Sequence, residues 1–182
     1  MKNRPSVAGD VLAATLKSQY HASLAMLREA IEKCPEDLWY SAVPTNAFWQ
    51  VTYHALFFAH LYSQPNERAF RPWTRHQSDV QHEDGIPGPP DPNSRLPLIP
   101  RPYSKADALE YCAWCEGMID AAVDILDLSS ADCGFSWYSV SKLEHQIVNI
   151  RHIQHHTAQL ADRLRAATGD GVRWHGKGWA CM

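Results

Sequence analysis

The chain has 182 residues, of which 45% are hydrophobic, and a formal net charge of −3. This length predicts a single domain, residues 1–182, with a sizeable core. Positive charge forms no run that would neutralise phosphates, so we expect no nucleic-acid partner. The N-terminus lacks a signal-peptide pattern, and the most apolar stretch, HALFFAHLY, is far too short to span a bilayer. These features predict a cytoplasmic protein without a membrane partner.

The five cysteines are an odd number without the spacing of a disulfide framework, which is typical of a reducing compartment. Cys112 and Cys115 form a C-x-x-C pair, the pattern of a redox site or of half a zinc site. However, both fall on an apolar stripe with the four-three spacing of a buried helix seam. We therefore expect these two thiols in the core.

Two helices are expected before the proline-rich region. The first begins near Asp10, a suitable N-cap, and ends at Pro35. The second follows Pro44 and Thr45 and ends before Pro65. Residues 65–103 then hold nine of the twelve prolines, so this segment is expected to be irregular. A loop of this length in a small domain is expected to be either a lid over a site or a packing surface.

Two more helices are expected after this insert. Ser104 is the predicted N-cap of a helix over 105–126, with Asp107 in its first turn. The last helix runs from about residue 139 to Thr168 and ends at Gly169. Because no segment alternates with a strand period, four long helices predict an all-α fold, a four-helix bundle.

The glycine-rich tail, residues 169–182, follows this last helix. We expect the tail to fold back through Trp174 and Trp179 or to dock on a second subunit. His175 lies between a tryptophan and a glycine in this tail, and is expected to be exposed.

Three histidines lie close together in the last helix. His152 and His156 are one turn apart on a stripe at the edge of the apolar face, a separation at which two imidazoles can reach one metal ion. His155 points elsewhere and is expected in solvent or behind a ligand. The pair alone is weak evidence, since it also fits two histidines at the edge of a core.

The second helix supplies a possible third ligand. His54 lies at the centre of an apolar arc and is expected to point inward. A lone inward histidine is more often a hydrogen-bonded core residue. Together with His152 and His156, however, it would complete a set of three neutral nitrogen ligands with coordination positions left open. His60 lies about 120° from His54 around the helix and is expected at the surface or behind a ligand.

The segments FWQVTYHALFFAHLYS and LEHQIVNIRHIQHHTAQL resemble the DinB-like superfamily of putative metalloenzymes, also called DinB/YfiT-like. The resemblance implies that His54, His152 and His156 hold a divalent metal ion, usually zinc or nickel. It also implies a four-helix bundle with a crossover between the second and third helices, and a homodimer. The interval from Trp49 to His54 is shorter than in many members, so His60 remains the alternative ligand.

The same resemblance implies several activities. Relatives include S-transferases that use a low-molecular-weight thiol, and proposed metal-dependent hydrolases. No carboxylate accompanies the histidine pair as in an H-E-x-x-H motif, which favours thiol transfer to a small electrophile over hydrolysis. A non-catalytic metal-binding or stress-response bundle is the remaining alternative. No catalytic residue is assigned, and the candidates for orienting the ligands are Glu144, Asn149, Gln159 and Tyr53.

Overall fold

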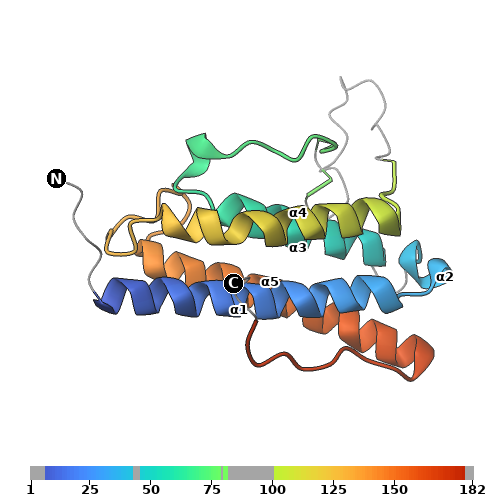
Figure 1. The fold of residues 1–182 in the computed structure, drawn as a ribbon. Coiled ribbons are helices and arrows are strands. Elements are labelled where there is room, and N and C mark those ends of the chain that lie inside the picture. Colours follow the sequence, from blue (N-terminus) through green and yellow to red (C-terminus); the bar gives the residue numbers. More distant parts are fainter. Residues whose placement is uncertain (1–6, 43–45, 79, 82–100, 179–182) are drawn as a thin grey trace, which may run out of the picture.

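The computed structural model of this chain describes residues 7–42, 46–78, 80–81 and 101–178, and this part of the chain is helical without strands (Figure 1). The helices are α1 (Val7–Lys33), α2 (Glu36–Trp39), α3 (Phe48–Tyr62), α4 (Lys105–Asp124) and α5 (Lys142–Thr168), with a 3-10 helix η1 (Glu67–Ala69). The predicted all-α class is therefore confirmed. No helix in these ranges is both long enough and apolar enough to cross a bilayer.

Local capping explains where the later helices begin and end. The Ser104 hydroxyl accepts a hydrogen bond from the amide of Asp107, and the Ser104 amide donates to the Asp107 carboxylate, which starts α4 as predicted. Gly169 ends α5 as predicted, because its φ of 76° is left-handed. The start of α5 was predicted near residue 139, but Ser141 is its N-cap.

Three features of the first half differ from the sequence prediction. The helix α1 begins at Val7, so Asp10 lies in its first turn and is not its N-cap. The short helix α2 was not predicted; the buried side chain of Trp39 holds it, donating from Nε1 to the carbonyl of Tyr103 at 2.8 Å. The insert contains one turn of 3-10 helix, η1.

The four long helices pack side by side, and their polar contacts give their directions (Figure 1). Ion pairs join Lys17 to Asp124 and His21 to Asp120, so α1 and α4 are antiparallel. By contrast, Tyr20 bonds Gln146 and Met26 contacts Gln154, so α1 and α5 are parallel. The pairs Ala59–Asn149 and Asn46–Arg163 make α3 antiparallel to α5.

These directions leave α3 and α4 parallel to each other. A chain that leaves the end of α3 must therefore travel back along the helices before α4 begins, a distance of about 30 Å for a helix of the length of α4. Residues 65–103 make this connection. In its described part, Trp73, Val80 and Tyr103 are buried and pack on the core, which agrees with the second of the two expected roles, a packing surface. Residues 82–100 of the insert lie outside the described residues.

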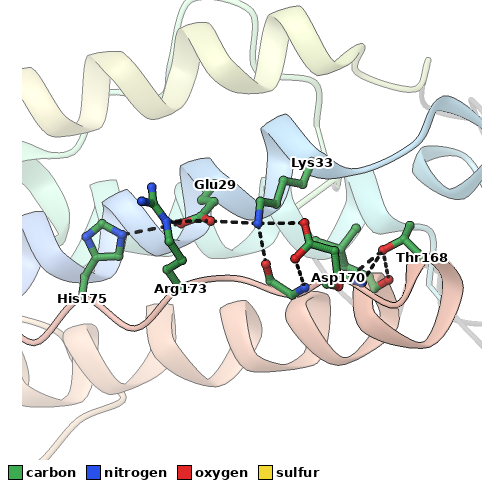
Figure 2. A network of polar contacts seen from close by, with 8 residues as sticks. Glu29, Lys33, Thr168, Asp170, Arg173 and His175 are labelled. Atoms are coloured by element: carbon green, nitrogen blue, oxygen red, sulfur yellow. Dashed lines mark hydrogen bonds and ion pairs between the residues drawn. The ribbon is translucent and has the colours of Figure 1, made fainter.

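The C-terminal tail folds back along α1, as predicted, but not through Trp174, whose side chain is 78% exposed. The buried carboxylate of Glu29 contacts Lys33 at 3.1 Å, Arg173 at 3.2 Å and His175 at 3.6 Å (Figure 2). Ion pairs at this acid, together with hydrogen bonds between the tail and α1, hold residues 170–178 in place, with no aromatic anchor among the described tail residues. Trp179 lies outside the described residues.

Four side chains test the expected pattern of burial. The spacing of an ideal helix would place Ile147 on the apolar face of α5, but its side chain is 48% exposed. His60 was expected at the surface or behind a ligand but is 3% exposed, because Phe70 and Trp114 cover its ring. Cys112 and Cys115 lie in the core as predicted, and burial raises the pKa of both thiols.

Candidate metal site

The antiparallel packing of α3 on α5 brings three histidine rings together. The Nε2 atom of His152 lies 3.0 Å from Nε2 of His54 and 3.0 Å from Nε2 of His156. The ligand atoms of all three residues lie within 4.8 Å of one another, and in the described part of the chain they form a group that could hold a metal ion. The convergence of His54, His152 and His156 expected from the sequence is therefore present.

Hydrogen bonds behind the rings orient two of these histidines. The Nδ1 atom of His54 lies 2.7 Å from the backbone carbonyl oxygen of Gln81, and Nδ1 of His156 lies 2.9 Å from Oε1 of Gln159. Because these oxygens only accept, each Nδ1 carries the hydrogen, and each Nε2 of a neutral ring carries a lone pair. Such outer partners fix the tautomer in protein metal sites.

This arrangement of hydrogens fits a cation better than it fits three rings alone. His54 and His156 both direct a lone pair toward Nε2 of His152, which carries at most one hydrogen. If that hydrogen forms one of the two 3.0 Å contacts, the other contact sets a lone pair against a nitrogen with no second hydrogen to donate. With the hydrogen of His152 on Nδ1 instead, a cation at the centre would accept all three Nε2 lone pairs.

The spacing of the nitrogens also matches a transition-metal ion. Two imidazole nitrogens that each lie about 2.1 Å from one ion are separated by about 3.0 Å at a right angle and about 3.4 Å at a tetrahedral angle. The two separations of 3.0 Å from Nε2 of His152 belong to this range. The ligand atoms of the whole group lie within 4.8 Å of one another.

Two of the three histidines are partly exposed to solvent, and an aromatic side chain packs against them. His54 and His152 are half-buried, whereas His156 is 3% exposed. Phe58, one turn after His54 on α3, packs against the rings of His54 and His152 with centroid separations of 4.8 and 5.4 Å. Trp73 of the crossover does not take part in this packing and stacks on Tyr111, with centroids 4.7 Å apart.

Of the four residues expected to orient the histidine rings, one contacts a histidine of the group. Gln159 contacts His156, as proposed from the sequence. Asn149 instead donates to the Ala59 carbonyl, the Tyr53 hydroxyl contacts His76, and Glu144 is exposed in the first turn of α5. The partner that sequence reasoning missed is the carbonyl of Gln81, and no signal could reveal it, because every residue carries that group.

The other histidines near these helices do not join the group. His60, the alternative ligand, lies on another side of α3, where its Nδ1 is 3.1 Å from the Tyr111 hydroxyl. Burial lowers the pKa of His60 to about 4. His155 is exposed, as expected, and lies 3.3 Å from the Gln159 amide. His175 belongs to the Glu29 cluster on α1.

A cavity of about 770 Å³ lies away from these histidines, between η1 and the segment that precedes α5. Its lining includes Arg68, Asp132, Phe135 and Tyr138 but none of the three grouped histidines. Its size therefore has no bearing on the metal site, and we assign the candidate chemistry to the histidine group.

Comparison with known proteins identifies no relative: no family model, curated protein or solved structure matches this chain. The geometry of the site is consequently the basis for any assignment of function.

Proposed function

We propose that this protein is a divalent-metal-dependent enzyme of the DinB-like kind, with a four-helix bundle that carries the metal on α3 and α5. The observation that supports this best is the convergence of three Nε2 atoms, two of them with their lone pairs set by Gln81 and Gln159. Imidazole ligands suit zinc and nickel, the two ions proposed here.

The proposed reaction transfers a low-molecular-weight thiol to a small electrophile. When bound, the ion would stabilise the anionic form of a thiol or of water. In thiol transfer, sulfur bonds to an electrophilic carbon, the thiol proton is released, and any leaving group departs with its electron pair. The protein's own contribution is to orient the ligand rings and, through Phe58, to shield one side of the site from water.

Hydrolysis of a small substrate is the alternative reaction. It would require a general base, and the group formed by His54, His152 and His156 contains no carboxylate. A purely structural metal is the non-catalytic alternative. The partial exposure of His54 and His152 argues against it, because structural sites are usually closed by four protein ligands.

Metal content tests the first part of this proposal. Protein purified without a metal-affinity tag is expected to carry about one equivalent of zinc or nickel by elemental analysis, and His152→Ala is expected to lose it. His155→Ala is the matched control, because that neighbouring ring is exposed and outside the group. Equal metal content in wild type and His152→Ala would refute the site.

A thermal measurement adds a second readout. Zinc at about 100 times its dissociation constant should stabilise the folded state by about 2.7 kcal/mol, which raises the Tm of a chain this size by about 5–10 °C. His54→Ala should show no such rise. A rise of equal size in His54→Ala would place the ion elsewhere.

Activity tests the reaction class. We expect the metal-loaded protein to accelerate the reaction of glutathione or cysteine with 1-chloro-2,4-dinitrobenzene. With His152→Ala, the reaction should proceed only at its uncatalysed rate. If the loaded protein instead cleaves p-nitrophenyl acetate and does not conjugate thiols, the hydrolase alternative is correct. No acceleration of either reaction would favour the non-catalytic alternative.

We also propose that the protein forms a homodimer. Val11 on α1 and Ile125 just after α4 are 60% and 66% exposed, and a second copy would remove such apolar side chains from water. Sedimentation equilibrium is expected to give twice the chain mass of 20.6 kDa. A single monomeric species at tens of micromolar would contradict this.

A further inference from the structure

Hydrogen bonds join the two described ends of the 65–103 crossover to each other. The side-chain amide of Gln77 pairs with the backbone of Arg101: Nε2 donates to the carbonyl at 2.9 Å, and the Arg101 amide donates to Oε1 at 3.0 Å. The Tyr103 hydroxyl donates to the Arg75 carbonyl at 2.6 Å and accepts from the Gln77 amide at 3.0 Å. We call Gln77, Arg101 and Tyr103 the crossover clasp.

Tyr53 anchors this clasp to α3. The rings of Tyr53 and Tyr103 stack with centroids 4.4 Å apart and an angle of 16° between their planes. The Tyr53 hydroxyl lies 2.7 Å from Nδ1 of His76, and the two rings also stack. Since Tyr53 directly precedes His54, the clasp is fixed to the same turn of α3 that presents a metal ligand.

The clasp continues by backbone contacts to His54 itself. The Val80 amide donates to the Gln77 carbonyl at 3.5 Å, and the Val80 side chain is buried in the core. The next residue is Gln81, whose carbonyl oxygen accepts the hydrogen bond from Nδ1 of His54 at 2.7 Å. The position of that oxygen therefore depends on where Gln77 is held.

We propose that Gln77 and Tyr103 are positioning residues of the metal site, acting through the Gln81 carbonyl to orient the ring of His54. This inference rests on the proposed metal binding. It adds that the protein binds the metal ion with full affinity only when the crossover clasp is formed. By thermodynamic reciprocity, metal binding must then stabilise the clasp by the same free energy.

Tyr103→Phe is the sharpest test, because it removes both hydroxyl hydrogen bonds and keeps the ring that stacks on Tyr53. Zinc affinity is measured on the full chain by competition with a chromophoric chelator. We expect about tenfold weaker binding, the lower end of the range for loss of a direct orienting partner. Tyr40→Phe, in the exposed turn after α2, is the matched control and should bind as wild type.

Two further readouts separate positioning from a general loss of stability. The visible spectrum of the cobalt(II)-loaded protein should change in Tyr103→Phe, because it reports ligand geometry. In wild type, zinc should slow hydrogen exchange at the Gln77 amide, and in His54→Ala it should not. If Tyr103→Phe does not fold, Gln77→Ala removes the pairing with Arg101 from a half-buried position and takes its place.

The outcomes distinguish this inference from the proposed metal site. If His152→Ala binds zinc as tightly as wild type, the site itself is wrong. If His152→Ala loses zinc but Tyr103→Phe binds within twofold of wild type, with an unchanged cobalt spectrum, the positioning role is overturned and the metal site stands.

Discussion

Replacing His145 by phenylalanine should remove a large part of the protein's sensitivity to acid. The His145 ring is fully buried against Phe135, Tyr62 and Tyr138, with centroids 4.7 to 5.0 Å away, and neither ring nitrogen has a hydrogen-bond partner among the described residues. Burial, reinforced by the positive charge of Lys142, lowers the pKa of His145 to about 4.

The direction of the effect follows from proton binding. In the unfolded chain a histidine has a pKa of about 6.5, so below that pH the unfolded state binds the proton more readily than the folded state. The stability contributed by a neutral buried ring is complete above pH 6.5 and is lost as the pH falls toward 4. Between pH 8 and pH 5 the loss from His145 is about 2 kcal/mol.

Denaturant unfolding of wild type and His145→Phe at pH 8 and pH 5, with chelator present, measures this loss of folding stability. The variant should lose about 2 kcal/mol less than wild type between the two pH values. At pH 8 it should be at least as stable, because an apolar ring replaces two unpaired polar atoms. Tyr138→Phe alters the same cluster and should keep the wild-type pH dependence. Equal losses in wild type and His145→Phe would refute the reasoning.

Two other substitutions probe the tail and the thiols. A β-carbon at Gly178 would lie 2.3 Å from Cβ of His21, so Gly178→Ala should lift the tail and speed tryptic cleavage there. A β-carbon at Gly176 would meet only the exposed indole of Trp174, at 3.3 Å, so Gly176→Ala should not. Equal cleavage rates in the two variants would contradict the docked tail. The four described cysteines are buried, Cys112 and Cys133 completely, so a Cys181→Ser variant should expose no thiol to Ellman's reagent until denatured. Rapid labelling of the native variant would contradict that burial.

Features that depend on a few neighbouring residues could be predicted from the sequence. The start of α4 depends on Ser104 and Asp107, which satisfy each other's backbone groups, and the end of α5 depends on the left-handed conformation that Gly169 adopts readily. The pairing of His152 with His156 is also local, since one helical turn sets their separation. The sequence therefore predicted these helix ends and two of the three grouped histidines from local chemistry.

The choice between His54 and His60 required the tertiary structure. Both lie on α3, which is apolar on nearly every side, so its sequence does not specify which side faces α5. The packing of α4, α5 and the crossover decides this, enclosing His60 with Trp114 and turning His54 toward His152.

The tertiary structure also decided the hydrogen-bond partners of the grouped histidines. The Gln81 carbonyl that orients His54 is a backbone group, and its place depends on the whole path of the crossover. The sequence by itself determined the four long helices and the residue types that can bind a metal. Only the packing of the helices and of the crossover decided which nitrogens meet, because contacts between distant segments depend on the relative positions of the helices and not on local propensity.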